Sequence, residues 1–416
     1  MKSPELKHLM EMIVQCLNQM DERLTGHGER VAYGMLTLLD ADGSFSSEEK
    51  AKIIWTMLLH DIGSFHNPDI KDLLKKETDT AFSHSRYGYL FLNYLGPFPE
   101  YAGVVLYHHS GCKEADRSDM PKRLKRLSKC LQVLDAVDLK QVGNPSVTLE
   151  QMENFLNAMN TERYEEDSIR AVKEMLPKLM RALKSQEEIH QVLLGHLEQM
   201  RISQDIQEQL LRMLVSSIDF RSHYTALHCA VMVRVSDLLA QLCGLEEKER
   251  RQVHLGAILH DLGKIAIPSE ILESPGKLEG QDWEIMKTHV SITETILKGH
   301  VEEEVLQIAV RHHETLSGQG YPYGIGKEGL SLPQRIAAVA DITSALSEER
   351  SYKPAFRLEE VLEILEKLAQ SGRICPYVFG VLKENKEMIY EEALKAGTEA
   401  RKMYEKIYNK YQKCNK

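Results

Sequence analysis

The sequence predicts an all-α protein made of two helical domains joined by a helical connector. Apolar residues recur at three- and four-residue spacing along most of the 416 residues, whereas alternating strand-like runs are scarce. A chain of this length exceeds what one ordinary hydrophobic core fills, so at least two domains are expected. We predict domains at 1–160 and 214–416, with the connector at 161–213.

A weak internal repeat supports this division. The first half contains, in order, His27, His60-Asp61, His84 and His108-His109, and the second half contains His228, His260-Asp261, His289 and His312-His313. Successive intervals are 33, 24 and 24 residues in the first half and 32, 29 and 23 in the second. The flanking runs WTMLLHDIG and GAILHDLG are also similar. We therefore expect one helical unit to occur twice, each copy with its own buried polar cluster.

Charged amphipathic helices are predicted at two further places. The connector, 161–213, is rich in Glu, Lys, Arg, Leu and Met and contains few Gly or Pro residues. The last segment, about 376–416, has the same character and is expected to be a solvated packing helix.

A further helix is predicted to end at the His260-Asp261 pair. Ile258 and Leu259 belong to an apolar stripe that leads into the pair, and Gly263 and Pro268 supply helix-ending signals beyond it. Two polar side chains at the end of an apolar helix are suited to form part of a site.

Composition excludes several classes of function. The net charge of −10 and the lack of a basic run argue against DNA binding, and no stretch approaches the roughly 18 apolar residues of a membrane span. The first residues do not resemble a signal peptide. Seven dispersed cysteines without a CxxC pair indicate reduced thiols. We therefore expect a cytoplasmic protein.

The ordered histidines of the second half, with two aspartates, are the candidate metal ligands. One histidine on an apolar face is usually a hydrogen-bonded core residue, but a buried adjacent pair is costly unless both rings are satisfied. Imidazoles and carboxylates without thiolates suit manganese, iron, nickel or zinc, and Asp261 can bridge two ions through its two oxygens. The candidates are His228, His260, Asp261, His289, His312, His313 and Asp341.

Two features beside these ligands suit an anionic ester. Lys264 follows the His-Asp pair in HDLGK and can place a point charge on a phosphate oxygen. After the double histidine, Gly320, Tyr321 and Pro322 predict a stiff loop in which glycine allows close approach and the tyrosine ring offers a stacking face.

Three segments carry a family resemblance. HDLGK (260–264), HHETLSGQGYP (312–322) and ADITSALSEERSYKPA (340–355), with His228 and His289, closely resemble the HD-GYP family of cyclic di-GMP phosphodiesterases over about 216–372. The first half resembles the broader HD superfamily only. The resemblance implies tandem HD-type helical domains. It also implies that the seven candidates bind two divalent ions, that Lys264 contacts the scissile phosphate, and that Arg350 and Lys353 help to hold phosphates.

The implied reaction is hydrolysis of cyclic di-GMP to linear pGpG by a hydroxide that bridges the two ions, with a further step to GMP left open. Iron or manganese is the expected metal, with nickel or zinc as alternatives. Two other functions stay open at this point. One is an HD-type phosphohydrolase that acts on another nucleotide, such as cyclic GMP-AMP or an alarmone, and the other is a non-catalytic cyclic-dinucleotide sensor.

The chain departs from the family pattern at several positions. Ser317 and Ser344 replace aspartates that are common in the family, and Tyr224 stands where some members have a glutamate ligand for a third ion, so two ions are expected. In the first half Ser64 replaces the lysine, and Gln132 aligns with Asp341.

We therefore expect the first half to be a catalytically silent copy. A homo-oligomeric contact or a signalling partner would act through it. Residual metal binding there remains open, because Asp135 or Asp138 could supply the missing carboxylate if the helix register differs.

Overall fold

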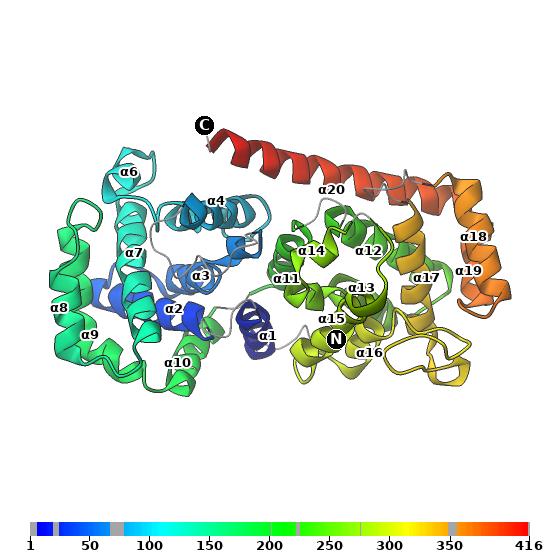
Figure 1. Ribbon diagram of the computed structural model, residues 1–416, viewed down its shortest axis with the longest axis horizontal. Coiled ribbons are helices and arrows are strands. Elements are labelled where there is room, and N and C mark those ends of the chain that lie inside the picture. Colours follow the sequence, from blue (N-terminus) through cyan, green and yellow to red (C-terminus); the bar gives the residue numbers. More distant parts are fainter. Residues whose placement is uncertain are drawn as a thin grey trace. The chain divides into compact units, whose positions relative to one another are not determined.

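The computed structural model describes residues 6–19, 25–66, 79–200, 202–221, 225–274, 276–347 and 356–414. Every regular element in these ranges is helical, and one isolated antiparallel bridge joins Ser317 to Gly326 (Figure 1). The predicted all-α class is confirmed. Tyr224, Arg350 and Lys353 lie outside the described residues.

The chain divides into two compact units. We call Glu5–Met213 the N-terminal unit and Leu214–Asn409 the C-terminal unit. No helix within the described ranges is long and apolar enough to span a bilayer.

The N-terminal unit is a cluster of helices around α2 and α7. Helix α2 packs against α3 and α7, and α4 packs against the 3₁₀ turn η2. The predicted connector contributes to this unit, because α9 packs on α7 and α10 packs on α2. The elements are α1 (Leu6–Asn18), α2 (His27–Asp42), α3 (Ser47–Leu58), η2 (Ile62–His66), α4 (Asp79–Tyr94), η4 (Pro99–Tyr101), α5 (Ala102–Leu106), α6 (Cys112–Arg117), α7 (Lys122–Gly143), α8 (Leu149–Asn157), α9 (Glu166–Ala182) and α10 (Gln186–Glu198).

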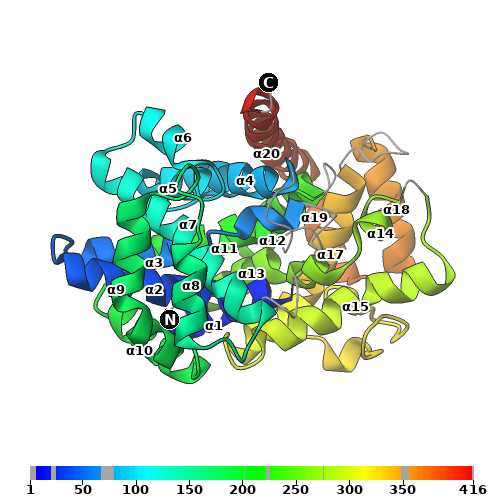
Figure 2. The same ribbon diagram turned by 60° about the vertical axis from the view of Figure 1, so that its left-hand side comes forward.

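The C-terminal unit repeats this arrangement around α12, α13 and α17. Figure 2 shows these three helices beside one another. Helix α12 packs against α13 and α17, and η5 packs against α15. The elements are α11 (Gln204–Asp219), α12 (Thr225–Leu242), α13 (Glu247–Leu259), η5 (Leu262–Ala266), α14 (Ser269–Leu272), α15 (Gly280–Leu297), α16 (Glu303–Val310), η6 (Lys327–Gly329), α17 (Leu332–Ser347), α18 (Leu358–Gln370), α19 (Pro376–Glu384) and α20 (Lys386–Cys414). The part of α11 before Leu214 and the part of α20 after Asn409 lie outside this unit.

The turn after α13 is held closely against α15. Gly263 has no side chain, and a Cβ atom there would lie 1.9 Å from the carbonyl oxygen of His289. Its amide donates to Thr293 Oγ1 at 2.8 Å. In the N-terminal unit, a Cβ on Gly63 would lie 2.1 Å from the carbonyl oxygen of His84. Each unit therefore uses a glycine to bring its His-Asp pair against the helix that carries the next histidine of the repeat.

Candidate metal centre

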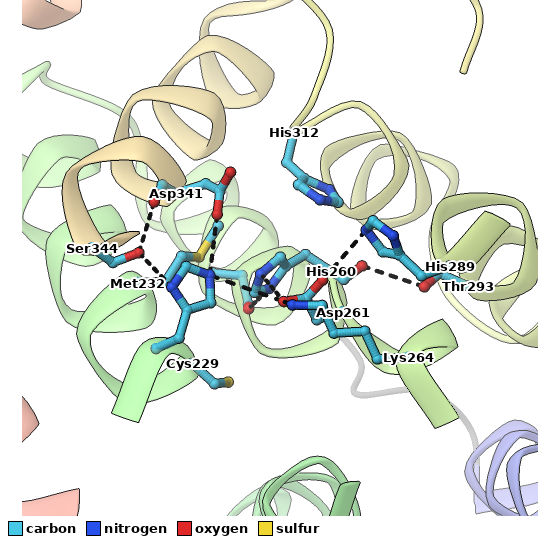
Figure 3. A network of polar contacts seen from close by, with 12 residues as sticks. Cys229, Met232, His260, Asp261, Lys264, His289, Thr293, His312, Asp341 and Ser344 are labelled. Carbon is cyan, nitrogen blue, oxygen red and sulfur yellow. Dashed lines mark hydrogen bonds and ion pairs between the residues drawn. The ribbon is translucent and has the colours of Figure 1, made fainter. Parts of the chain in front are cut away.

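Five helical elements bring the seven candidate ligands of the C-terminal unit into one buried cluster. Figure 3 shows five of these side chains gathered around one region, namely His260, Asp261, His289, His312 and Asp341. The exposed fractions are 9% or less for the six most buried members. The ligands are His228 on α12, His260 and Asp261 at the end of α13, His289 on α15, His312 and His313 after α16, and Asp341 on α17.

Three of the imidazoles are oriented by their own helices. Nδ1 of His260, His289 and His312 lies 2.8, 2.6 and 2.6 Å from the carbonyl oxygen three residues earlier. A carbonyl can only accept, so Nδ1 carries the proton in each ring and Nε2 has a free lone pair. Each Nε2 is buried and has no hydrogen-bond partner among the described residues. Orphaned acceptors of this kind fit a bound cation.

The two carboxylates lie between imidazoles from different elements. Asp261 Oδ2 is 3.0 Å from His260 Nε2, and its Oδ1 is 3.4 Å from His289 Nε2. Asp341 Oδ1 is 3.1 Å from His228 Nε2, and its Oδ2 is 3.6 Å from His313 Nδ1. Each carboxylate therefore offers one oxygen to each side of the cluster.

The ligand atoms form two groups, each with the spacing of a metal site. One group is His228, His260 and Asp261, and the other is His289, His312 and His313; within each group the atoms lie within 4.8 Å of one another. Two groups that share carboxylates fit a pair of divalent ions.

The protonation states also suit metal binding. Burial favours the neutral acid, but the neighbouring imidazoles and Lys264 hold the pKa of Asp261 well below its usual range. Burial lowers the pKa of His313 to about 3, so this ring is neutral at pH 7. His260 differs, because Asp261 raises its pKa against the effect of burial, and a proton therefore competes for this nitrogen. Charged carboxylates and neutral imidazoles are the forms that bind metals.

Lys264 lies against one of these carboxylates. Its Nζ is 2.5 Å from Asp261 Oδ2. The turn that carries it is held by Arg221, whose guanidinium donates to the carbonyl oxygens of Lys264, Ile265 and Ile267 at 2.8–3.0 Å. No sequence pattern predicts this role of Arg221, because its partners lie more than 40 residues further along the chain.

The predicted glycine-rich loop lies beside the double histidine. A Cβ on Gly320 would lie 2.5 Å from the carbonyl oxygen of His313, so only glycine fits there. The Tyr321 ring centre is 4.6 Å from that of His313 and 5.8 Å from that of Trp283. Pro322 follows at the surface. Tyr321 is thus held at the rim of the cluster by two neighbouring rings.

Several residues that sequence reasoning did not select support this site. The buried Glu314 carboxylate accepts the amides of Tyr323 and Ile325 at 2.7 and 2.9 Å, which fixes the loop. Ser344 Oγ is 3.0 Å from His228 Nδ1 and so orients that ring. Burial raises the pKa of Asp219, a neighbour of Lys264, to about 8.

The sequence alignment of Gln132 with Asp341 is wrong. Gln132 donates its side-chain amide to the Ser110 carbonyl oxygen at 2.6 Å. Asp135, one helical turn later, places Oδ1 3.4 Å from His27 Nε2, as Asp341 does with His228. Residues three apart share a helix face, so the sequence pattern did not distinguish these registers.

Two family models match the chain, and both are described as HD domain. One covers residues 24–140 and the other covers 208–378. Together they include both histidine clusters.

Curated relatives and a solved structure are also similar. The 3′3′-cGAMP-specific phosphodiesterase 1 of Vibrio cholerae is 28% identical over 406 residues, which is 93% of each chain. The 3′3′-cGAMP-specific phosphodiesterase 2 of V. cholerae is 31% identical, in an alignment that covers 62% of this chain and 48% of the relative. The cyclic di-GMP phosphodiesterase response regulator RpfG of Xanthomonas campestris is 39% identical over 40% of this chain and 45% of its own.

A crystal structure of a cyclic GMP-AMP-specific phosphodiesterase from V. cholerae superimposes with a TM-score of 0.56 at 21% identity. The superposition covers 93% of this chain and 98% of that one. The two chains therefore share their fold.

Proposed function

We propose that this chain, which belongs to the HD-domain family and carries two HD domains in tandem, is a metal-dependent cyclic-dinucleotide phosphodiesterase. One observation carries the proposal. Two groups of buried ligand atoms share Asp261 and Asp341, and a lysine lies 2.5 Å from the first of these carboxylates. This arrangement suits a phosphate ester that binds two ions.

The residues of the C-terminal cluster would hold two divalent ions, with iron or manganese preferred and nickel or zinc as alternatives. Bound there, such ions would activate water and withdraw charge from phosphoryl oxygens. The imidazoles that donate Nδ1–H to their own helices keep Nε2 available without rearrangement. Asp261 and Asp341 stay ionised because the surrounding rings favour their charged forms.

The remaining side chains would bind and orient the ester. Lys264 places a positive charge beside Asp261, where it neutralises a phosphoryl oxygen as negative charge develops. The Tyr321 ring, packed between His313 and Trp283, offers a face for a nucleobase at the rim. Glu314 keeps that loop in place through two amides. Arg350 and Lys353, outside the described residues, remain proposed phosphate contacts.

Two cyclic dinucleotides are candidate substrates. Cyclic di-GMP, opened to linear pGpG, is supported by the HDLGK and HHETLSGQGYP motifs and by the similarity to RpfG. The mixed dinucleotide 3′3′-cGAMP is supported by a relative that aligns along 93% of both chains, the N-terminal unit included. We place cyclic di-GMP first. We also propose a cytoplasmic location, which suits the free thiols of the six cysteines whose side chains the structure describes.

The test is product analysis with the full chain, loaded anaerobically with manganese or iron. Cyclic di-GMP, 3′3′-cGAMP and a guanosine polyphosphate are supplied separately, and linear products are separated by chromatography. We expect a cyclic dinucleotide to be linearised and an Asp261→Ala variant to be inactive. Turnover of the polyphosphate alone would contradict the proposal. Tight binding of a cyclic dinucleotide to fully metallated protein without turnover would instead identify a sensor.

A further inference from the structure

We infer that the N-terminal unit holds a second pair of divalent metal ions, in a centre separate from the one proposed for catalysis. The inference rests on the geometry of this unit and does not depend on the activity proposed above. Two groups of ligand atoms occur here as well, each with its atoms within 4.8 Å of one another. They are His27, His60 and Asp135, and Asp61, His84, His108 and His109.

The imidazoles of this cluster face one another through their Nε2 atoms. Nδ1 of His60 and of His108 lies 2.7 and 2.6 Å from the carbonyl oxygen three residues earlier, so Nε2 of each ring has a lone pair. His60 Nε2 is 3.2 Å from His27 Nε2, and His84 Nε2 is 2.8 Å from His109 Nε2. Ring nitrogens held this close need a proton or a cation to offset the repulsion of their lone pairs.

The seventh ligand is Asp135, which lies three residues after Gln132, the residue that the alignment of the two halves places opposite Asp341. Asp135 Oδ1 is 3.4 Å from His27 Nε2, and Asp138 Oδ2 is 2.7 Å from Nδ1 of the same ring. In the C-terminal unit Asp341 and Ser344 approach His228 in the same way, at 3.1 and 3.0 Å. Asp135 therefore matches Asp341, and no carboxylate is missing.

Asp138 acts as a support for the ring. Arg30 donates to both of its oxygens, at 2.6 and 2.9 Å, and so balances its charge. Its bond to His27 Nδ1 fixes the ring with Nε2 toward the cluster. A carboxylate that orients a ligand histidine is a common support of metal sites.

Asp61 connects the two groups. Its Oδ2 is 3.4 Å from His27 Nε2, and its Oδ1 is 3.4 Å from His84 Nε2. Asp261 makes the corresponding approach to both groups in the C-terminal unit. A carboxylate that offers one oxygen to each group is the expected bridge between two ions.

The main difference between the clusters is that Lys264 of the C-terminal unit is replaced by a serine in the N-terminal unit. Ser64 occupies the position of Lys264, is fully buried, and has a hydroxyl with no hydrogen-bond partner among the described residues. Ser64 therefore supplies no counterpart of the 2.5 Å contact that Lys264 makes with Asp261. The N-terminal centre thus suits divalent transition metals, held by five imidazoles and two carboxylates, and it has no lysine at the position of Lys264.

Metal analysis of the full chain tests the inference. Protein loaded anaerobically with manganese and then desalted is measured by mass spectrometry for metal per chain. We expect four ions in the unsubstituted chain and two after the double substitution His260→Ala and His312→Ala, which removes one imidazole from each group of the C-terminal unit. Anomalous diffraction at the manganese edge should place the remaining two between α2, α4 and α7. Two ions in the unsubstituted chain, all lost with the double substitution, would overturn the inference.

A matched pair of substitutions on α7 tests the register. Asp135→Asn is nearly isosteric and should lower the metal content toward three or two ions, whereas Gln132→Ala should leave four. Circular dichroism and the metal-induced rise in melting temperature show whether each variant is folded. Equal metal content in the two folded variants would contradict the role of Asp135. If the unsubstituted chain binds four ions but turns over no nucleotide, the proposed function fails and this inference stands.

Discussion

At the scale of single residues, each cluster depends on histidines whose tautomer is set by the local helix. The i−3 carbonyl holds Nδ1–H at five positions, two in the N-terminal and three in the C-terminal unit. This bond joins each histidine to the backbone of its own helical turn, so it does not require a bound ion. The two units differ at a neighbouring residue, which is Lys264 in one and Ser64 in the other.

Replacing Lys264 by the residue of the other unit should separate substrate chemistry from metal binding. We expect Lys264→Ser to lower kcat about 100-fold, the usual cost of losing one charge-stabilising group. Metal content should be unchanged, since Lys264 contacts a ligand and is not one. The control is Lys277→Ser, whose parent side chain is 86% exposed and which should behave as the unsubstituted chain. Parallel loss of metal and activity in the Lys264 variant would contradict the assigned role.

At the scale of elements, the clusters depend on how closely short turns approach neighbouring helices. Gly263 and Gly63 permit this approach for η5 on α15 and for η2 on α4. Arg221 then fastens η5 through three carbonyl oxygens. The His-Asp pairs are therefore positioned by backbone contacts between distant segments.

A methyl group at Gly263 should disrupt this packing. Because its Cβ would lie 1.9 Å from a backbone oxygen, we expect Gly263→Ala to lower the free energy of unfolding by about 3 kcal/mol or more. Gly380→Ala is the control, since a Cβ there meets nothing within 4 Å in helix α19, and it should raise stability by about 0.5–1 kcal/mol. Chemical denaturation of both variants measures the difference. Equal stability of the two variants would show that η5 can move away from α15.

Glu49, in the first turn of α3, should make the stability of the protein depend on pH. Bonds from Arg123 and Ser46 lower the pKa of Glu49 from 4.5 to about 2, so its ionised form stabilises the native state. This contribution is complete above about pH 4.5 and is lost as the pH falls toward 2. We expect Glu49→Gln to cost less than about 1 kcal/mol at pH 7, because the pair is solvent-exposed. The difference from the unsubstituted chain should shrink in denaturation curves recorded at lower pH, and a constant difference would contradict the prediction.

At the scale of the whole molecule, the chain contains the same helical unit twice. Each unit holds two carboxylates among imidazoles, and each is compact by itself. An ion that binds only the folded state raises its stability, by about 2.7 kcal/mol at a free concentration 100 times Kd. The expectation that a partner or a second copy acts through the N-terminal unit stays a prediction.

Removing metal from the full chain should therefore affect both activity and stability. We expect prolonged dialysis against a chelator to abolish turnover and lower the melting temperature, because Asp261 and Asp341 lose the cations that offset their charge. Manganese or iron, added back without oxygen, should restore both properties, and magnesium should restore neither because it prefers oxygen ligands. Calorimetry and product analysis follow the two properties. Full stability and turnover in metal-free protein would contradict a metal centre in either unit.

The sequence by itself determined the helical class, the duplication and the identity of most cluster residues, because helical periodicity and residue spacing are local properties. It grouped His228, His260, His289, His312 and His313 with Asp261 and Asp341, and the structure brings all seven together. Only the tertiary structure decided that Asp135 and not Gln132 faces His27. It also revealed Arg221 and Glu314. Their partners are set by how helices cross and how closely turns approach, which the spacing of residues along one chain does not encode.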